Sequence, residues 1–426
     1  MLFLLLRQMI KIRFTICILC IIIAFTSCQH EELELKSERG RQVLVYMIAD
    51  NNLDYFAVRD INEMERGMGK DSDSELFVYI DRGVNGKPSH PYLLKIISDT
   101  TENIVSKIIL TYPEQNSADP KVLEQVIKDV SEISKNKNPP KGLVLWSHGN
   151  AWLPPAISLY SDRDKIIDTT TNVSSIKSFG YDETLLDTES GHREMDIIEL
   201  AETLSPYHFD FILFDACYMG TIEVAYELKD VCNYIICSPT EILSDGFPYD
   251  KIVNKLFSQP LQFKAIAEDQ HSYYNSQKGI LKSAAICVVK TDGLDNLSTF
   301  FNNEFTNSIS NISIEKKNLS YTKDSLQQFD RLGAEFLFDM EDFVSRICKQ
   351  KNKMMLLNEF HKCWHETVIY EKHTKSIVGS LELKSCNGLS IYIPQNYPSR
   401  EKIKEYYKKL SWYEASNSSK LFLHFK

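Results

Sequence analysis

The chain has 426 residues, of which 43% are hydrophobic, 11% aromatic and 25% charged. These fractions are those of an ordinary globular protein and exclude wholesale disorder. The length allows two or three domains, at about 150 residues for each. The formal net charge of −10 argues against a general nucleic-acid-binding protein, which would need a basic surface.

The first 27 residues have the composition of an export signal. They contain three basic residues and no acidic one, and the apolar run FTICILCIIIAF is too short to span a bilayer comfortably. The small residues before Cys28 are similar to a bacterial lipobox, although Phe25 stands where Leu is usual. We therefore expect a lipoprotein-type signal peptide over 1–27, a lipid on Cys28 and a polar tether over 28–41. Plain secretion, or an uncleaved anchor, is the alternative.

The cysteine count bears on the redox chemistry of an exported protein. Ten cysteines are present, and three of them lie at or before the predicted processing site. The remaining number is odd, which argues against a complete disulfide framework and indicates at least one free thiol.

Apolar runs and helical periodicity alternate along the next 250 residues. Strands are predicted at 43–50, 76–81, 141–149, 209–217, 232–239 and 283–290, with a hairpin formed by 92–97 and 104–110. Helices are predicted at 54–68, 119–135, 195–204 and 221–229. Strands that are apolar almost throughout, and that are separated by helices, are typical of a parallel sheet covered on both faces. The fold class is therefore α/β.

The pattern changes twice. Residues 150–190 are long, polar and without clear periodicity. Beyond residue 290 the chain consists of predicted Asn/Ser-rich helices with a late strand at 388–394. We therefore expect one domain over 42–290 and an α+β extension over 291–426 that completes or covers it.

Polar residues end three of the predicted strands, which is where active residues of such sheets lie. The stretches are Ala49-Asp50-Asn51-Asn52, Ser147-His148-Gly149-Asn150 and Asp215-Ala216-Cys217-Tyr218. Neighbouring parallel strands lie about 4.8 Å apart, so adjacency of two of these strands would bring His148 and Cys217 to one rim. A thiolate is a strong nucleophile, and an imidazole can lower the pKa of the thiol and later protonate a leaving amine. The amides of Gly149 and Cys217 could bind a developing oxyanion.

Three of these segments carry a resemblance to a known family. VYMIADNNLD, LVLWSHGNAW and FDFILFDACYMGTIEVAYEL, supported by IICSPTEILSDGFPYDKI, resemble the clostripain family of cysteine peptidases over roughly residues 40–290. The resemblance implies a caspase-like three-layer sandwich with a mostly parallel sheet. It also implies cleavage of peptide bonds after Arg or Lys through a thioacyl intermediate.

Residue roles follow from the resemblance, position by position. His148 becomes the general base and acid, and Cys217 the nucleophile. Asp215 becomes the acid that faces the basic side chain, since residues i and i+2 of a strand point to the same side. Glu241 and Asp245 in the loop after 232–239 are weaker candidates for the same pocket, and Asn51 or Asp50 for its wall.

The resemblance has limits that bear on the site. The family often has a Gly-rich run after the histidine, whereas only Gly149 is kept here. Family members are often cut between His and Cys after a basic residue, for which Arg163, Lys165 and Lys177 are available. No cofactor is required and no metal ligand is assigned. Calcium stays open, because one member is associated with it, although the sequence has no 12-residue EF-hand loop.

These observations together predict an exported cysteine endopeptidase of the cell envelope, anchored through a lipid and acting as a monomer on peptides or proteins with Arg or Lys at the cut. Nucleic acid is not expected as a partner. Two alternatives stay open. One is an inactive peptide-binding protein of the same fold, and the other is a different thiol acyl-transfer enzyme, such as an amidase or a transpeptidase.

Overall fold

The computed structural model describes residues 40–69, 73–84, 87–155, 179–182, 194–313, 325–330, 336–395 and 401–425. The predicted signal peptide, Cys28 and nearly all of the tether lie outside these residues. The three basic residues of the predicted activation segment, Arg163, Lys165 and Lys177, lie outside them too.

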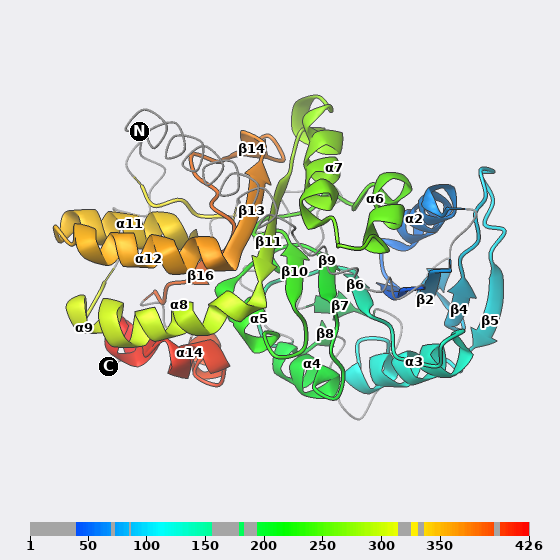
Figure 1. The fold of residues 1–426 in the computed structure, drawn as a ribbon, viewed down its shortest axis with the longest axis horizontal. Helices are drawn as coiled ribbons and strands as arrows, with labels where there is room; N and C mark the ends of the chain where they lie inside the picture. The colour runs from blue at the N-terminus through cyan, green and yellow to red at the C-terminus, as the bar shows by residue number, and fades with distance from the viewer. Residues whose placement is uncertain are drawn as a thin grey trace, which may run out of the picture. The chain divides into compact units, whose positions relative to one another are not determined.

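Five parallel strands form the middle of a mixed sheet (Figure 1). Their spatial order is β10 (Tyr234–Cys237), β9 (Phe211–Asp215), β6 (Gly142–Trp146), β1 (Gln42–Ala49) and β2 (Glu75–Val84). Each of the predicted strands over 43–50, 76–81, 141–149, 209–217 and 232–239 is confirmed by one of them. They are buried and almost wholly apolar because helices cover both faces of the sheet.

Antiparallel strands flank the parallel centre. On one side, β4 (Tyr92–Lys95) and β5 (Lys107–Thr111) form the predicted hairpin, and the short β3 (Lys87–Pro88) pairs with β2. On the other side, β11 (Ala285–Lys290) runs antiparallel to β10, which differs from the expected parallel direction. Two successive helices, α6 (Tyr249–Leu256) and α7 (Phe263–Asn275), separate these strands on one face of the sheet. The chain therefore runs along that face twice and enters β11 from the opposite end.

Side chains of successive β1 residues enter two separate cores. Leu44, Tyr46 and Ile48 pack in one core, with α3 (Pro120–Ile133), α4 (Ile197–Leu204) and α5 (Ile222–Glu227). Val43, Val45 and Met47 pack in the other, with α2 (Asp54–Gly67), α6 and α7. Figure 1 shows these helix groups on opposite faces of the sheet. The predicted three-layer α/β sandwich is thus confirmed.

Several helices begin at capping side chains that the sequence supplies. Asp119 accepts a hydrogen bond from the Lys121 amide at the start of α3, where Pro120 takes the first helical position. Asp196 caps α4 and Thr221 caps α5 in the same way. The cap Thr221, four residues after Cys217, fixes where α5 begins.

The chain beyond residue 290 contributes to the sheet and to the end of β9. Helices α8 (Leu294–Phe300), α11 (Met340–Gln350) and α12 (Met354–Thr367) precede β13 (Val368–His373), which pairs antiparallel with β11. The late strand β16 (Ser390–Tyr392) pairs with β12 (Leu337–Asp339) in a separate two-stranded sheet. The Ser390 amide and hydroxyl donate to the Gly220 carbonyl at 2.9 and 3.2 Å. This region therefore supports the loop that follows β9.

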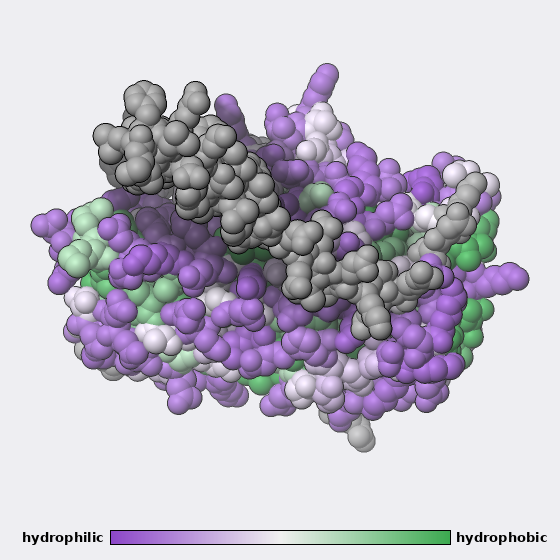
Figure 2. Space-filling view, viewed as in Figure 1, coloured by the Kyte–Doolittle hydropathy of each residue, from purple (hydrophilic) through white to green (hydrophobic). Residues whose placement is uncertain are grey.

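The remaining described helices are short, and most of them lie near the C-terminus. The shorter elements are α9 (Thr306–Ser308), α13 (Glu401–Tyr407), α14 (Ser411–Ala415), α15 (Ser418–Leu421), β7 (Phe179–Tyr181), β8 (Glu194–Met195), β14 (Ser376–Ile377) and β15 (Leu381–Glu382). Among the described residues, no helix is both long and apolar enough to cross a membrane. The face drawn in Figure 2 is mainly hydrophilic, with hydrophobic side chains at the outer end of α11 and α12, where Met354 and Met355 are exposed.

Candidate active site

The ends of β6 and β9 bring the predicted dyad to one edge of the sheet. The two strands are adjacent and parallel, with Trp146 opposite Asp215, and the Ser147 amide donates to the Asp215 carbonyl at 3.3 Å. His148 and Cys217 each lie two residues beyond this pair. Both are partly exposed, whereas the strand residues before them are buried. The expected adjacency of these two strands is present in the structure.

Gly149 packs directly against the backbone of Cys217. A Cβ atom at Gly149 would lie 2.5 Å from the Cys217 carbonyl oxygen and 3.2 Å from its amide nitrogen. The first distance is too short for any residue other than glycine without movement of the backbone, and the second is tight. The two amides named as candidate oxyanion donors therefore belong to chain segments that touch each other.

The imidazole of His148 is held by a side chain that the sequence analysis did not single out. Its Nε2 lies 2.8 Å from Oδ1 of Asn52, in the turn that follows β1. An amide oxygen only accepts hydrogen bonds, so Nε2 of the imidazole is the donor in this contact. The Gly180 amide donates to the His148 carbonyl at 3.0 Å and holds its backbone from the other side. The signal for Asn52 was its place at the end of β1, next to β6.

Asn51, which was predicted to line the site, has its side chain bound to the backbone around the β1–α2 turn. Its Nδ2 donates to the carbonyls of Ile48 and Tyr181, and its Oδ1 accepts from the Leu53 amide. The side chain is buried and ties the β1–α2 turn to β7. Adjacent turn residues point in different directions, which sequence position alone does not resolve. Asp50, its alternative, is buried beside β2.

The Cys217 thiol faces the loop that follows β10. The Ile242 amide donates to Sγ at 3.3 Å, and Sγ lies 3.5 Å from the Ile242 carbonyl oxygen. The Tyr218 amide donates to the Thr240 carbonyl at 2.9 Å, which fastens the same loop to the residue after the thiol. Glu241 directly precedes Ile242 and is therefore part of the loop that contacts the thiol. Its side chain is largely buried.

Asp215 lies beneath the thiol in a buried acidic pair. Its Oδ2 accepts from the Phe247 amide at 3.0 Å and from the Tyr249 hydroxyl at 2.9 Å. Asp60 on α2 accepts from the Trp146 indole at 2.8 Å. Gly246 packs against both acids. A Cβ there would lie 2.6 Å from Oδ2 of Asp215 and 3.2 Å from Oδ2 of Asp60.

Burial governs the protonation of this pair. Desolvation raises the pKa of Asp215 to about 6, against the opposing effect of its hydrogen bonds. Desolvation and the charge of Asp215 raise the pKa of Asp60 well above its usual range. Asp60 thus keeps its proton more strongly, and the negative charge at neutral pH resides on Asp215. Among the described residues, none donates a hydrogen bond to Oδ1 of Asp215.

Asp245 is the third predicted acid of the pocket, and it already forms an ion pair with an arginine of the chain. Nη1 of Arg59 on α2 lies 2.6 Å from its Oδ1, with both side chains about one third exposed. The Tyr274 hydroxyl donates to the Gly246 carbonyl at 2.6 Å. Burial raises the pKa of Tyr274, and the nearby charges of Asp215 and Asp245 raise it further. The structure thus gathers Asp215, Asp245 and Arg59 around the loop 241–249.

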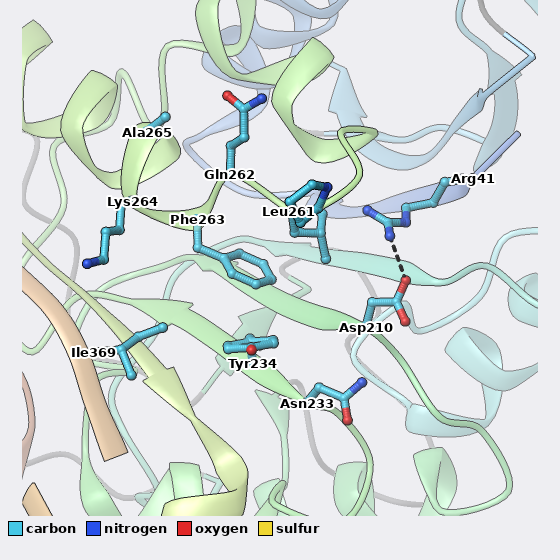
Figure 3. Close-up of a pocket in the computed structure, with 11 residues that line it drawn as sticks. Arg41, Asp210, Asn233, Tyr234, Leu261, Gln262, Phe263, Lys264, Ala265 and Ile369 are labelled. Atoms are coloured by element: carbon cyan, nitrogen blue, oxygen red, sulfur yellow. Dashed lines mark ion pairs between the residues drawn. The ribbon is translucent and has the colours of Figure 1, made fainter. Parts of the chain in front are cut away.

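A cavity of about 680 Å³ lies at the opposite end of the sheet (Figure 3). Its wall includes Arg41 and Asp210, which form an ion pair at 3.0 Å, and the rings of Tyr234 and Phe263. Arg41, Asp210 and Tyr234 precede or begin strands, whereas His148 and Cys217 follow strand ends. This cavity is therefore separate from the candidate active site.

Comparison with known proteins agrees with this architecture. The family model described as the clostripain family, Peptidase C11, matches residues 45–424. An inactive zymogen of a C11 protease from Parabacteroides distasonis is 31% identical, with a TM-score of 0.67, over 88% of this chain and 97% of its own. A secreted C11 cysteine protease from Bacteroides thetaiotaomicron, solved with an irreversible peptide inhibitor, is 28% identical, with a TM-score of 0.67, over 89% of this chain and 99% of its own.

A curated relative is more distant. Clostripain from Hathewaya histolytica is 25% identical over 254 residues, which are 53% of this chain and 44% of clostripain. This chain therefore matches less than half the length of that relative.

The fold and the family match define a C11-type cysteine peptidase. The chain belongs to the clostripain family, and the resemblance found in its sequence is confirmed.

Proposed function

We propose that this chain is an exported cysteine endopeptidase that cleaves after Arg or Lys, with Cys217 as nucleophile and His148 as general base and acid. The observation that carries the proposal is the adjacency of the β6 and β9 ends, which puts a histidine and a cysteine on one rim with Gly149 against the Cys217 backbone. This arrangement offers a nucleophile, a base and two oxyanion donors within one site.

The mechanism follows from these groups. The His148 imidazole, oriented by Asn52, takes the proton of the Cys217 thiol. The thiolate attacks the scissile carbonyl, and the amides of Gly149 and Cys217 stabilise the negative oxygen. His148 then gives the proton to the leaving amine, and the thioester forms. Water, deprotonated by the same imidazole, attacks the thioester and releases Cys217.

The preference for a basic residue rests on Asp215. It is ionised above a pH of about 6, since its pKa is raised to about 6. It lies two residues before the nucleophile on the same strand. A carboxylate in this position would give a charge-assisted hydrogen bond to Lys and a bidentate one to Arg. Asp245 would contribute less, because Arg59 already pairs with it.

Export and anchoring rest on the sequence before residue 40. One of the structural relatives is a secreted C11 protease, which supports export of this chain. The lipobox-like residues before Cys28 support a lipid anchor in the cell envelope. Radiolabelled fatty acid incorporated by the wild type and absent from Cys28→Ala would establish the anchor; equal labelling of both would exclude it.

The function itself is tested by covalent labelling. The full chain and its Cys217→Ala form are incubated with biotinylated peptides that carry an electrophile after Lys, Arg, Leu or Ala. Labelling of the wild type by the Lys and Arg probes, with none in Cys217→Ala, is the expected result. Equal labelling by all four probes would favour another thiol acyl-transfer enzyme. An unlabelled Cys217 would favour the inactive peptide-binding protein.

A further inference from the structure

A second group of acidic side chains lies at the same end of the sheet, beside β1 and β2. Asp50 follows β1, Asp81 lies near the end of β2, and Glu114 lies between β5 and α3. One carboxylate oxygen from each lies within 4.8 Å of the others. The three residues come from separate segments, so the fold itself brings these charges together.

The oxygens of Asp81 and Glu114 have few hydrogen-bond donors among the described residues. The Asp81 side chain is fully buried, and among the described residues no donor reaches its Oδ1 or either carboxylate oxygen of Glu114. The other oxygen of Asp81 accepts from the Ser117 hydroxyl at 2.6 Å. Buried carboxylate oxygens without a partner are costly, and buried charges are normally paired or bound to a metal. The unpaired oxygens of Asp81 and Glu114 therefore point to a cation as the missing partner.

The spacing and the number of carboxylates indicate which cation fits. Oxygens bind Ca²⁺ at about 2.3–2.6 Å, so two ligands on opposite sides of the ion are at most about 5 Å apart. Mg²⁺ binds at about 2.0–2.1 Å, which limits the separation to about 4.2 Å. All three oxygens here lie within 4.8 Å of one another, a spacing that the larger ion spans. Mg²⁺ is usually held by one or two carboxylates and keeps several waters, so three carboxylates favour the larger ion. Three carboxylates are also hard oxygen ligands, which suit calcium better than zinc.

We propose that Asp50, Asp81 and Glu114 form a binding site for one divalent cation of the size of calcium. Asp182 adds negative charge next to it, since its Oδ2 accepts from the Ser117 amide at 3.0 Å while the Ser117 hydroxyl bonds to Asp81. The site has no EF-hand loop, because its ligands come from different strand ends.

The position of the site gives it a structural role. Asp50 lies two residues before Asn52, which bonds Nε2 of His148. Asp182 lies two residues after Gly180, which donates to the His148 carbonyl. A cation beside Asp50 and Asp182 would therefore fasten both segments that hold the imidazole. The effect on catalysis rests on the proposed function, whereas binding of the cation does not.

Binding is measured on the full chain carrying Cys217→Ala, so that self-cleavage cannot interfere. After treatment with chelator, calcium is titrated by calorimetry, and Tb³⁺ luminescence is excited through tyrosine. Tyr79 is a suitable donor, since its hydroxyl lies 2.7 Å from Ser117 Oγ. The expected result is one calcium per chain, displacement of Tb³⁺ by calcium but only weakly by magnesium, and a rise of several degrees in the unfolding midpoint.

A double variant, Asp81→Asn with Glu114→Gln, keeps the side-chain shapes and removes two charges. We expect its calcium affinity to fall at least 100-fold, while its unfolding midpoint without calcium equals or exceeds that of the parent. Glu102→Gln, an exposed acid in the β4–β5 turn, is the control and should bind like the parent. Equal calcium affinity in the double variant and the parent would overturn the proposal. So would a folded parent that binds no calcium, or one in which magnesium displaces Tb³⁺ as well as calcium does.

If the double variant fails to fold, as judged by circular dichroism, Glu114→Gln alone replaces it. Glu114 is only partly buried and lies outside the strands, so its amide form is easily accommodated. A loss of at least 10-fold in calcium affinity is then expected, and unchanged affinity contradicts the site. Because every readout uses an inactive chain, failure here leaves the peptidase proposal untouched.

Discussion

Two neighbouring parts of the same sheet edge are built differently. At the ends of β6 and β9, Asp215 and Asp60 receive hydrogen bonds from a backbone amide, a tyrosine and a tryptophan. At the ends of β1 and β2, Oδ1 of Asp81 and both carboxylate oxygens of Glu114 have no donor among the described residues. The first part has its own partners and supplies the chemistry of the proposed mechanism. The second has an excess of negative charge and, with the proposed cation bound, would hold the first in place. The number of donors, rather than the number of acids, distinguishes the two.

The largest expected effect removes a chemical group from the first part. His148→Ala should lower kcat/KM by about 10²–10⁴-fold, the usual contribution of a general acid and base. Measurement with a fluorogenic Arg peptide checks it. The chain offers a matched control in His208, whose Nε2 also lies 2.9 Å from an asparagine, Asn233. His208→Ala should leave kcat/KM unchanged; a comparable loss in both variants would contradict the assignment of His148.

The next effect concerns the charge beneath the thiol. Asp215→Asn should reduce kcat/KM for Arg and Lys peptides by about 10- to 100-fold, since a hydrogen bond to a charged group contributes about 1.5–3 kcal/mol. Asp210→Asn, at the other end of the same strand, is the control and should keep the preference. Equal loss on neutral and basic peptides would show that Asp215 has only a structural role.

The pH dependence of KM tests whether Asp215 is charged when it binds a basic residue. The pKa of Asp215 is raised to about 6, so the carboxylate is ionised above this pH and neutral below it. The KM for a basic peptide should therefore rise as the pH falls through about 6. In Asp215→Asn this rise should disappear. A KM for basic peptides that stays constant from pH 8 to pH 5 in the wild type would argue against a charged pocket.

A smaller effect is expected where the second part supports the first. Asn52→Ala should lower kcat by about 10-fold with little change in KM, because the imidazole loses its orientation but no substrate contact. Asn52→Asp should raise the pKa of His148, since a carboxylate beside an imidazole favours its charged form. The acidic limb of the pH–rate profile would then move to higher pH. An unmoved profile in Asn52→Asp would mean that the contact at 2.8 Å is not made during catalysis.

The smallest effect is expected when Asp245 loses its ion-pair partner, Arg59. Arg59→Ala should strengthen the preference for basic over neutral peptides by a few fold, because partly exposed ion pairs contribute about 0–1 kcal/mol. Arg66 on the same helix, which lies 3.9 Å from Glu63, serves as the control for loss of one positive charge. A weaker preference in Arg59→Ala would show that Arg59 helps to bind the substrate instead.

Most of the fold was predictable because its signal is local. Apolar strands such as 209–217 and amphipathic helices such as 54–68 appear in the structure within a few residues of the predicted bounds. The direction of β11 was not predictable, because it depends on how many times the chain runs along the face of the sheet between β10 and β11. The pairing of β16 with β12, away from the main sheet, depends likewise on contacts between distant segments.

The site was partly predictable for the same reason. His148 and Cys217 end consecutive parallel strands, so their adjacency follows from topology. The role of Asn52 rather than Asn51 depends on side-chain directions in a turn, which no periodicity fixes. The pairing of Arg59 with Asp245 joins residues 186 positions apart, and neither has a sequence pattern that indicates the other.

The most direct test of the central claim is to map cleavage sites. The full chain and its Cys217→Ala form are each incubated with a diverse peptide mixture, and the cuts are read by mass spectrometry, including any within residues 150–190 of the chain itself. The account predicts cuts after Arg and Lys by the wild type and none by Cys217→Ala, with equal unfolding midpoints. Cuts by both forms, or cuts by the wild type without regard to the residue before the cleaved bond, would contradict it.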